Sequence, residues 1–266
     1  MPEIILVGLG LHDENGISVK GLEAVKSADT VFMEQYTSVM PGFSLRRFED
    51  ASGKKIHVLS RYELEEENGK AILEAAEEGV VVLLVSGDPL IATTHVTLRI
   101  EAKKRGILTR VVHGASVLTA VIGLSCLHSY KFGKSVTVPF PDETLADTPY
   151  DVISQNRKLG LHTLCLLDIK RNENRYLGID EALGALLAIE EKRRVGVVTR
   201  DSLIVGVARA GSDDVSVKAG AVSELAGYDF GGPPFSLVFT GKLHFMEAEA
   251  LIFLAGAPEQ IRRLVE

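Results

Sequence analysis

The chain of 266 residues contains 46% hydrophobic and 24% charged residues, a composition typical of a globular protein with one or two domains. Its formal net charge of −7 argues against a protein that grips nucleic acid over a broad basic face. No stretch approaches the roughly 18 apolar residues of a membrane span, and no basic segment precedes the first apolar run, so we expect a cytoplasmic protein without a membrane partner.

Strands and helices alternate over the first 125 residues. We expect strands at residues 4–7, 30–33, 56–59, 80–85 and 110–113. We expect a helix at residues 18–27 that is capped by Ser18, and a helix at residues 62–78 that ends at Gly79. Two further helices are expected, one from about residue 95 to residue 105 and one from residue 115 onward. This alternation predicts βαβ units and a largely parallel sheet.

The run at residues 80–85 contains six consecutive apolar residues and stops at Ser86-Gly87-Asp88-Pro89. A run of this kind is typical of a strand that is buried on both faces. Because ligands of open α/β sheets bind at the carboxyl ends of the strands, we expect residues 86–89 to form part of a small-molecule site.

The periodicity changes near Lys131, where Pro139 and Pro141 follow a short strand. We therefore expect an N-terminal α/β domain at residues 1–130 and a C-terminal α/β domain at residues 131–266. In the second domain we expect strands at residues 135–138, 163–167, 195–199, 202–208, 215–218 and 235–240. We expect one helix at residues 149–159, a second that Asp180 caps, and a third at residues 245–255. Short strands close together favour a mixed sheet there.

Known motifs match this sequence poorly. Gly8-Leu9-Gly10 follows a strand and Glu34 ends the next one, which raises a nicotinamide-dependent oxidoreductase as an alternative, but the third glycine position holds Asp13. No P-loop, zinc-binding spacing or nucleophile elbow occurs, so we expect no metal site and assign no catalytic residue. Cys126 and Cys165 are expected to be free thiols, and the seven scattered histidines to be structural or solvent-exposed.

Loops rich in small residues and poor in phosphate-binding cations remain as the candidate site. They are residues 8–11, 86–91, 113–117, 167–168, 209–211 and 231–234. Such loops can enclose an adenosine-sized ligand that carries no phosphate. Asp88 would then meet a ribose hydroxyl or a cationic centre, or it would merely cap its own turn.

Several segments resemble one family of enzymes. They are Gly8-Leu9-Gly10-Leu11, the run Ser86-Gly87-Asp88-Pro89-Leu90 with its continuation Ala92-Thr93-Thr94-His95, Tyr130-Lys131-Phe132-Gly133-Lys134, Leu167-Asp168-Ile169-Lys170, Ala208-Arg209-Ala210-Gly211 and Ala255-Gly256-Ala257-Pro258. Together they resemble the diphthine synthase family, within the tetrapyrrole-methylase-like class of S-adenosylmethionine-dependent methyltransferases.

The resemblance implies two α/β domains with a cofactor cleft between them, usually in a homodimer. It implies S-adenosylmethionine as cofactor, S-adenosylhomocysteine as product, and translation elongation factor 2 as the protein substrate. The methylated group would be the amino group of its 3-amino-3-carboxypropyl-histidine, in diphthamide biosynthesis. Methylation of a tetrapyrrole or of ribosomal RNA stays open as an alternative.

The same resemblance implies eight cofactor contacts. They are Leu11, Asp88, Ile91, Ser116, Val117, Leu167, Ala210 and Phe235. Two positions depart from the family pattern: Ser86 stands where a second glycine is common, and Phe235 stands where archaeal members tend to carry histidine. Lys131, Lys134 and Lys170 flank loops of the expected cleft and are therefore candidates for contact with the protein substrate, with ordinary surface lysines as the favoured alternative.

Overall fold

A computed structural model describes residues 1–36, 38–142 and 146–265. Contacts between residues divide the chain into two compact units, Met1–Val117 and Leu118–Glu266. This division falls before the boundary expected at residues 130 and 131, and the domain limits drawn from the sequence stay a prediction. The two units are described separately below as unit 1 and unit 2.

Unit 1 is built on a five-stranded sheet with the order β3-β2-β4-β1-β5, in which every neighbouring pair is parallel. Its strands are β1 (Glu3–Gly8), β2 (Thr30–Glu34), β3 (Ile56–Leu59), β4 (Val80–Val85) and β5 (Leu108–Val112). Its helices are α1 (Val19–Ser27), α2 (Leu45–Ser52), α3 (Lys70–Glu78) and α4 (Val96–Lys104). The parallel α/β architecture expected from the alternation of elements is confirmed.

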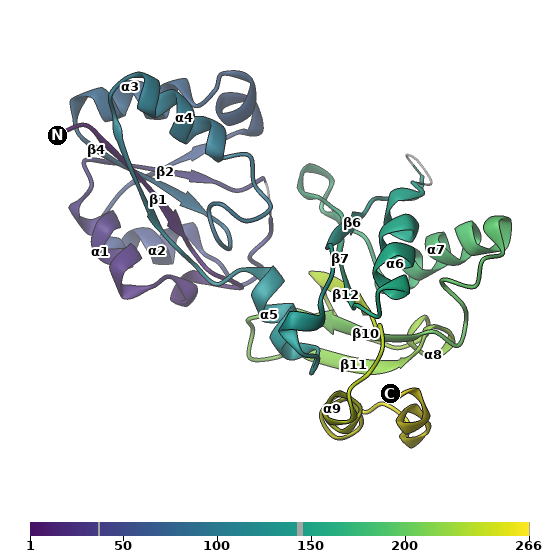
Figure 1. Cartoon of the computed structure of the whole chain (residues 1–266). Coiled ribbons are helices and arrows are strands. Elements are labelled where there is room, and N and C mark those ends of the chain that lie inside the picture. Colours follow the sequence, from purple (N-terminus) through teal and green to yellow (C-terminus); the bar gives the residue numbers. More distant parts are fainter. Residues whose placement is uncertain (37, 143–145, 266) are drawn as a thin grey trace. The chain divides into compact units, whose positions relative to one another are not determined.

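Both faces of this sheet are covered, as Figure 1 shows, with α3 and α4 on one side and α1 and α2 on the other. The side chains of β4 alternate between the two cores: Leu83 packs with residues of α3 and α4, and Leu84 packs with residues of α1 and α2. Since successive side chains of a strand point to opposite faces, an uninterrupted apolar run is what a doubly covered strand requires. The prediction of a buried strand at residues 80–85 is confirmed.

Helix ends in unit 1 follow local rules with one exception. Ser18 caps α1, and its Oγ accepts the Gly21 N–H at 3.1 Å. The single helix expected at residues 62–78 is wrong, because it is interrupted at Asn68 and Gly69, both of which have positive φ. A π-helical turn (Tyr62–Glu66) precedes this break and α3 follows it. α2 was not foreseen.

Unit 2 contains a five-stranded mixed sheet with the order β11-β10-β12-β7-β6. Its strands are β6 (Val136–Val138), β7 (Thr163–Leu167), β10 (Leu203–Ala208), β11 (Ser216–Ala221) and β12 (Phe235–Phe239), and β8 (Ile169–Lys170) pairs separately with β9 (Arg175–Tyr176). Its helices are α5 (Val117–Leu124), α6 (Thr148–Lys158), α7 (Ile179–Arg193), α8 (Val222–Leu225) and α9 (Phe245–Ala255). β6 and β7 are parallel while β10 and β12 run antiparallel to their neighbours, so the mixed sheet is confirmed.

Two expectations in unit 2 are wrong. Residues 195–199 form a loop rather than a strand, because the N–H groups of Gly196, Val197 and Val198 are bonded to the Glu190 carboxylate instead of to a neighbouring strand. Asp180 lies inside the first turn of α7 instead of capping it, since Gly178 is the capping residue. Both differences come from tertiary hydrogen bonds or backbone conformation that residue types alone do not specify.

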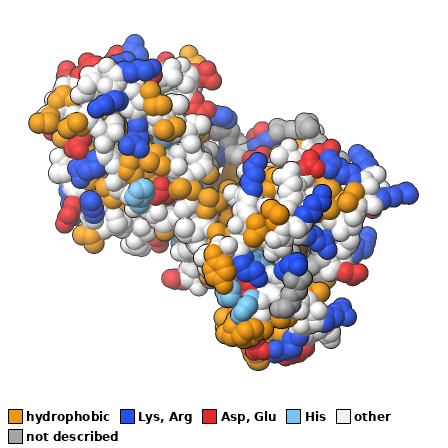
Figure 2. All heavy atoms as spheres, in the orientation of Figure 1, with side chains coloured by type: hydrophobic (Ala, Val, Ile, Leu, Met, Phe, Trp, Pro, Cys, Tyr) orange, Lys and Arg blue, Asp and Glu red, His pale blue; other side chains and the backbone are white. Residues whose placement is uncertain are grey.

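The surface of unit 2 is apolar along the outer side of α9. Ala248, Leu251 and Ala255 face inward and are buried, whereas Phe253 and Leu254 are 72% and 75% exposed. Figure 2 shows apolar side chains gathered at the lower end of the molecule, where Figure 1 places α9. Among the described residues, no helix is long and apolar enough to span a membrane.

Candidate functional site

Three loops leave adjacent strands at the same edge of the unit 1 sheet. They follow β4, β1 and β5, which are neighbours in the sheet and parallel, so their carboxyl ends lie together. These loops begin at Ser86, Leu9 and His113. The sequence contains no lysine or arginine at residues 8–13, 86–91 or 113–117. The small-molecule site expected from the sequence would lie at this cation-poor edge.

Glycine allows the three loops to pack backbone against backbone. A Cβ added to Gly8 would lie 2.5 Å from the Gly87 carbonyl oxygen and 2.6 Å from the Gly114 nitrogen. Gly10 and Gly87 exchange two backbone hydrogen bonds, at 2.8 and 3.2 Å, and both have positive φ. Because side chains would separate these loops, the glycines hold the sheet edge in one rigid arrangement.

Asp88 is buried in this edge, with 5% of its surface exposed. Its Oδ1 accepts the Leu90 N–H at 3.0 Å, which is the turn-capping role considered from the sequence. Its Oδ2 lies 2.7 Å from Nδ1 of His113, a contact that the sequence did not suggest. The carboxylate thus connects the loop after β4 to the loop after β5.

The neighbouring histidines of this edge differ in exposure. The His113 side chain is 73% exposed although its Nδ1 is held by Asp88. His95 is 1% exposed, and its Nδ1 lies 3.1 Å from the Pro89 carbonyl oxygen, which also accepts the Thr93 hydroxyl. His95 therefore secures the turn from inside, whereas His113 presents one end of its ring to solvent.

The structure brings five of the eight predicted cofactor residues to the loops of unit 1. Leu11 lies in the loop after β1, Asp88 and Ile91 in the loop after β4, and Ser116 and Val117 in the loop after β5 and the start of α5. Asp88 and Ser116 are buried, Leu11 and Val117 are partly buried, and Ile91 is 44% exposed. Ser86 does not have positive φ, so its replacement of a glycine is tolerated.

The other three predicted residues lie at one edge of the unit 2 sheet. Leu167 ends β7, Ala210 follows β10, and Phe235 begins β12. β12 is antiparallel to both neighbours, with Phe235 opposite Ala208 and Ser236 opposite Leu166, so its first residue lies beside their last ones. Phe235 is partly buried and packs against the core of unit 2.

The loop after β10 is tied down by Arg209. Its Nη1 donates to the carbonyl oxygens of Phe230 and Gly232, both at 2.7 Å, and its Nε donates to the Asp214 carboxylate at 2.8 Å. Ser212, which bonds to Asp214, and Arg209 hold the pKa of the Asp214 carboxyl below its usual range. Arg209 is thus occupied in positioning the loop that carries Ala210.

The alternative based on Gly8, Gly10 and Glu34 finds no support in the fold. β4 lies between β1 and β2, so the end of β2 is not adjacent to the glycine loop as a dinucleotide-binding unit requires. Glu34 is completely buried, and one of its oxygens accepts the Tyr36 N–H at 3.1 Å. The first α-helix after Gly10 begins only at Val19, after a short 3-10 turn.

Unit 2 contains a further buried carboxylate, outside the loops that carry the predicted residues of this unit. Glu247 of α9 is fully buried and accepts hydrogen bonds from Lys131 Nζ at 2.6 Å, from His162 Nε2 at 3.1 Å, and from the N–H groups of His128 and His244, both at 2.8 Å. Burial by itself raises the pKa of Glu247, but these donors hold it well below the usual range. Lys131, one of the lysines considered for contact with a protein substrate, is therefore a structural residue.

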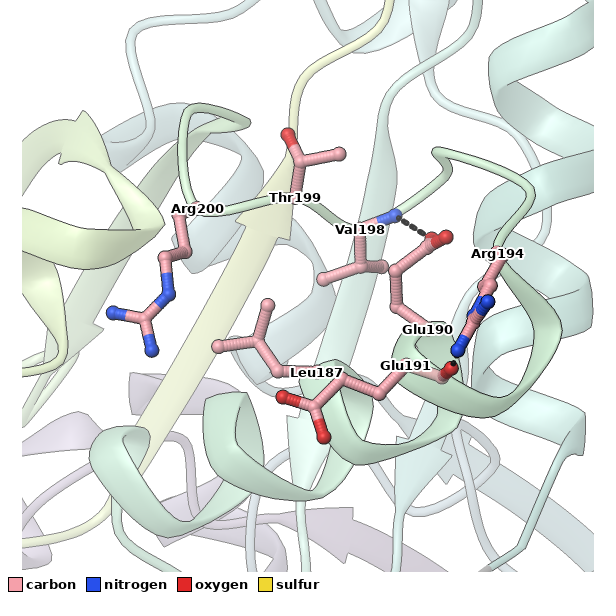
Figure 3. A pocket seen from close by; sticks show the side chains of 7 residues that line it. All are labelled: Leu187, Glu190, Glu191, Arg194, Val198, Thr199 and Arg200. Carbon is pink, nitrogen blue, oxygen red and sulfur yellow. Dashed lines mark hydrogen bonds between the residues drawn. The ribbon is translucent and has the colours of Figure 1, made fainter.

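Unit 2 also has a hollow of about 620 Å³ between α7 and the loop that follows it. It is lined by Leu187, Glu190, Glu191, Arg194, Val198, Thr199 and Arg200, as Figure 3 shows. Burial raises the pKa of Glu190, but the N–H groups of the following loop and the Tyr150 hydroxyl lower it to about 2. None of the eight predicted residues lines this hollow, and the partly buried Glu190 carboxylate already accepts hydrogen bonds from backbone N–H groups.

The donor set of the unit 1 edge fits the non-phosphorylated nucleoside of S-adenosylmethionine. A ligand can come close to the backbone of the glycine loops. The buried Asp88 carboxylate has free lone pairs that suit a hydroxyl or a cationic centre, and Ile91 offers exposed apolar surface. A pyrophosphate would instead need a helix amino terminus or cations, which these loops lack.

Comparisons with known proteins identify the family of this chain. The model of the family described as Tetrapyrrole (Corrin/Porphyrin) Methylases matches residues 3–226. The chain is 47% identical to a diphthine synthase of Methanosarcina mazei, over 99% of this chain and all of that protein. It is 47% identical to a diphthine synthase of Methanocella arvoryzae, over 95% of this chain and 98% of that protein. A crystal structure of a diphthine synthase superposes with a TM-score of 0.90 at 43% identity, covering 99% of this chain and all of the other.

Proposed function

We propose a function from the premise that the chain belongs to the tetrapyrrole methylase family and, within it, to the diphthine synthases. The chain is a diphthamide-biosynthesis methyltransferase. Its substrate is elongation factor 2, on the amino group of the 3-amino-3-carboxypropyl-histidine, and its cofactor is S-adenosylmethionine. The observation that carries the proposal is the cation-poor edge of glycine loops around the buried Asp88.

Eight residues are proposed to hold the cofactor. They are Leu11, Asp88, Ile91, Ser116 and Val117 of unit 1, and Leu167, Ala210 and Phe235 of unit 2. The cofactor supplies an electrophilic methyl group on a sulfonium centre. Asp88 binds a ribose hydroxyl or faces the cationic part of the ligand, while the glycine loops supply backbone donors and acceptors without a phosphate-binding cation.

Methyl transfer to an amine requires a nucleophile that is unprotonated and aligned. The chain then needs to position two reactants and to exclude water, and no nucleophilic side chain is required. The rigid packing of the three unit 1 loops supports such positioning, because small displacements of the reacting groups are costly.

Calorimetry and mass spectrometry test this proposal together. S-adenosylmethionine or S-adenosylhomocysteine should bind the wild-type protein and raise its melting temperature, whereas NAD should not. Mass spectrometry of elongation factor 2 carrying the extended histidine should then show added methyl groups and count them. Cofactor binding with methylation of a tetrapyrrole or of ribosomal RNA, and not of elongation factor 2, would replace the substrate part of the proposal.

The homodimer and the cytoplasmic location are further parts of the proposal and rest on the family resemblance. α9 offers an apolar surface of the kind that protein partners cover, since Phe253 and Leu254 are largely exposed. A second copy of the chain is the occupant that the resemblance implies. Light scattering should give twice the monomer mass for the wild type, and Phe253→Asp should reduce it; a monomeric wild type would contradict the dimer.

A further inference from the structure

The pair formed by Asp88 and His113 has a geometry that cofactor binding alone does not explain. The carboxylate is buried and the imidazole that it holds is 73% exposed. A carboxylate accepts hydrogen bonds and does not donate them, so the 2.7 Å contact places the proton of the neutral ring on Nδ1. Nε2 is then a free acceptor at the carboxyl edge of the unit 1 sheet.

Other histidines of the chain show what a structural imidazole looks like here. In His162, which is fully buried, Nδ1 accepts the Gly241 N–H at 2.9 Å and Nε2 contacts Glu247. His95 is buried against the turn that it bonds, and its Nε2 is buried without a partner, out of reach of a substrate. In His113, by contrast, one nitrogen is fixed by a buried acid, no described residue bonds to the other, and the side chain is exposed.

The proposed reaction needs a proton acceptor. An aliphatic amine is protonated near neutral pH and has no lone pair until it loses a proton. Histidine is the side chain that most readily accepts such a proton under these conditions, and a carboxylate on the opposite nitrogen both orients the ring and stabilises the imidazolium.

We infer that His113, oriented by Asp88, is the general base that deprotonates the substrate ammonium before methyl transfer; this inference rests on the proposed function. The N–H bond of the ammonium breaks, its electron pair stays on nitrogen, and the proton is taken by Nε2. The imidazolium then releases the proton to water. Each additional methyl transfer to the same nitrogen needs one more deprotonation, so the same residue serves every round.

His113→Asn is the sharpest variant. The Asn amide can still donate to Asp88 from near the position of Nδ1, but it lacks the Nε2 acceptor. With a general base removed, kcat should fall by about 100-fold or more, while the dissociation constant for S-adenosylmethionine should stay within about 2-fold of the wild type. His57→Asn, an exposed histidine of β3 in the same unit, is the matched control and should leave kcat unchanged.

Two further measurements separate a base from a structural residue. Added imidazole should restore turnover of His113→Ala in proportion to its concentration, because the exposed site admits it. Without cofactor or substrate, 15N NMR of the wild-type protein should show the Nδ1–H tautomer at His113, with the signal assigned by its loss in His113→Asn.

A kcat for His113→Asn near the wild-type value would overturn the inference, as would a large loss of cofactor affinity, which would make His113 a support for the binding site only. An Nε2–H tautomer in the NMR spectrum would also overturn it. If the wild-type protein binds no S-adenosylmethionine, the proposed function itself fails, and that failure is visible before any variant is made.

Discussion

Two buried carboxylates, Asp88 in unit 1 and Glu247 in unit 2, meet histidine side chains in different ways. Glu247 is surrounded by donors from four residues and lies wholly inside its unit. Asp88 binds one backbone N–H and one imidazole whose other end faces solvent. A hydrogen-bond network in which several donors surround a fully buried carboxylate, like that of Glu247, stabilises the fold. The network of Asp88 instead leaves one imidazole nitrogen exposed, and this nitrogen is able to accept a proton.

The largest effect is expected from Glu247→Ala. The change leaves the Lys131 ammonium, the His162 ring and two backbone N–H groups without their acceptor inside unit 2. Removing one partner of a buried ion pair costs about 3–5 kcal/mol of unfolding free energy. Urea denaturation followed by circular dichroism measures it, and a loss below about 1 kcal/mol would show that the network is not structural.

A slightly smaller loss of stability is expected from Gly8→Ala. The added methyl group would collide with backbone atoms of Gly87 and Gly114, which cannot move aside as a flexible side chain could. Overpacking of this kind costs about 3 kcal/mol. The melting temperature and the affinity for S-adenosylmethionine should both fall.

Gly184→Ala in α7 is the control for this substitution. A Cβ at Gly184 meets no atom within 4 Å, so the change removes only the flexibility of glycine. It should stabilise the protein by up to about 1 kcal/mol. Equal effects at Gly8 and Gly184 would show that close packing of the loops is unimportant.

Asp88→Asn should act on binding more than on folding. The amide oxygen can still accept the Leu90 N–H, but the negative charge that is proposed to face the cofactor is lost. Affinity for S-adenosylmethionine should fall about 10- to 100-fold, corresponding to the roughly 1.5–3 kcal/mol of a hydrogen bond to a charged group. Calorimetry measures the change, and an unaltered affinity would remove Asp88 from the proposed binding site.

The smallest effect is a pH dependence at Glu190. Its pKa is lowered to about 2 from an ordinary value near 4.5, because backbone N–H groups and the Tyr150 hydroxyl bond to the ionised form. The group therefore stabilises the fold above about pH 4.5, and this contribution disappears as the pH falls toward 2. The stability difference between the wild type and Glu190→Gln should shrink over that range; a constant difference would contradict the assignment.

The pattern of residue types was sufficient to predict much of the fold. The uninterrupted apolar run of β4 predicts burial on both faces, and Ser18 predicts a helix start, because both signals depend on neighbours in the sequence. Residues 195–199 were mistaken for a strand because apolar residues also occur in a loop whose N–H groups bond to a carboxylate. Nothing in the sequence around Glu190 indicates that its carboxylate accepts hydrogen bonds from these N–H groups.

The sequence likewise indicates some parts of the candidate site and not others. Glycine and aspartate after apolar runs indicated the unit 1 edge, and the family motifs indicated its individual residues. His113 lay in a recognised loop, but as one of seven scattered histidines it was assigned no chemical role; its position directly after a strand was the one available signal. Lys131 is a candidate for substrate contact in the sequence because it flanks a loop of the expected cleft. Its bond to Glu247 joins residues far apart in the chain, so no local pattern indicates it.

By itself, the sequence determined the alternation of elements, the buried strand and the absence of phosphate-binding residues from the loops, because these depend on local residue order and hydrophobic period. Only the tertiary structure decided that Asp88 bonds to His113 and that Glu247 bonds to Lys131 and His162. Such pairs form between strands and helices that are distant in the chain, and their partners are selected by strand order and packing, which no local pattern encodes.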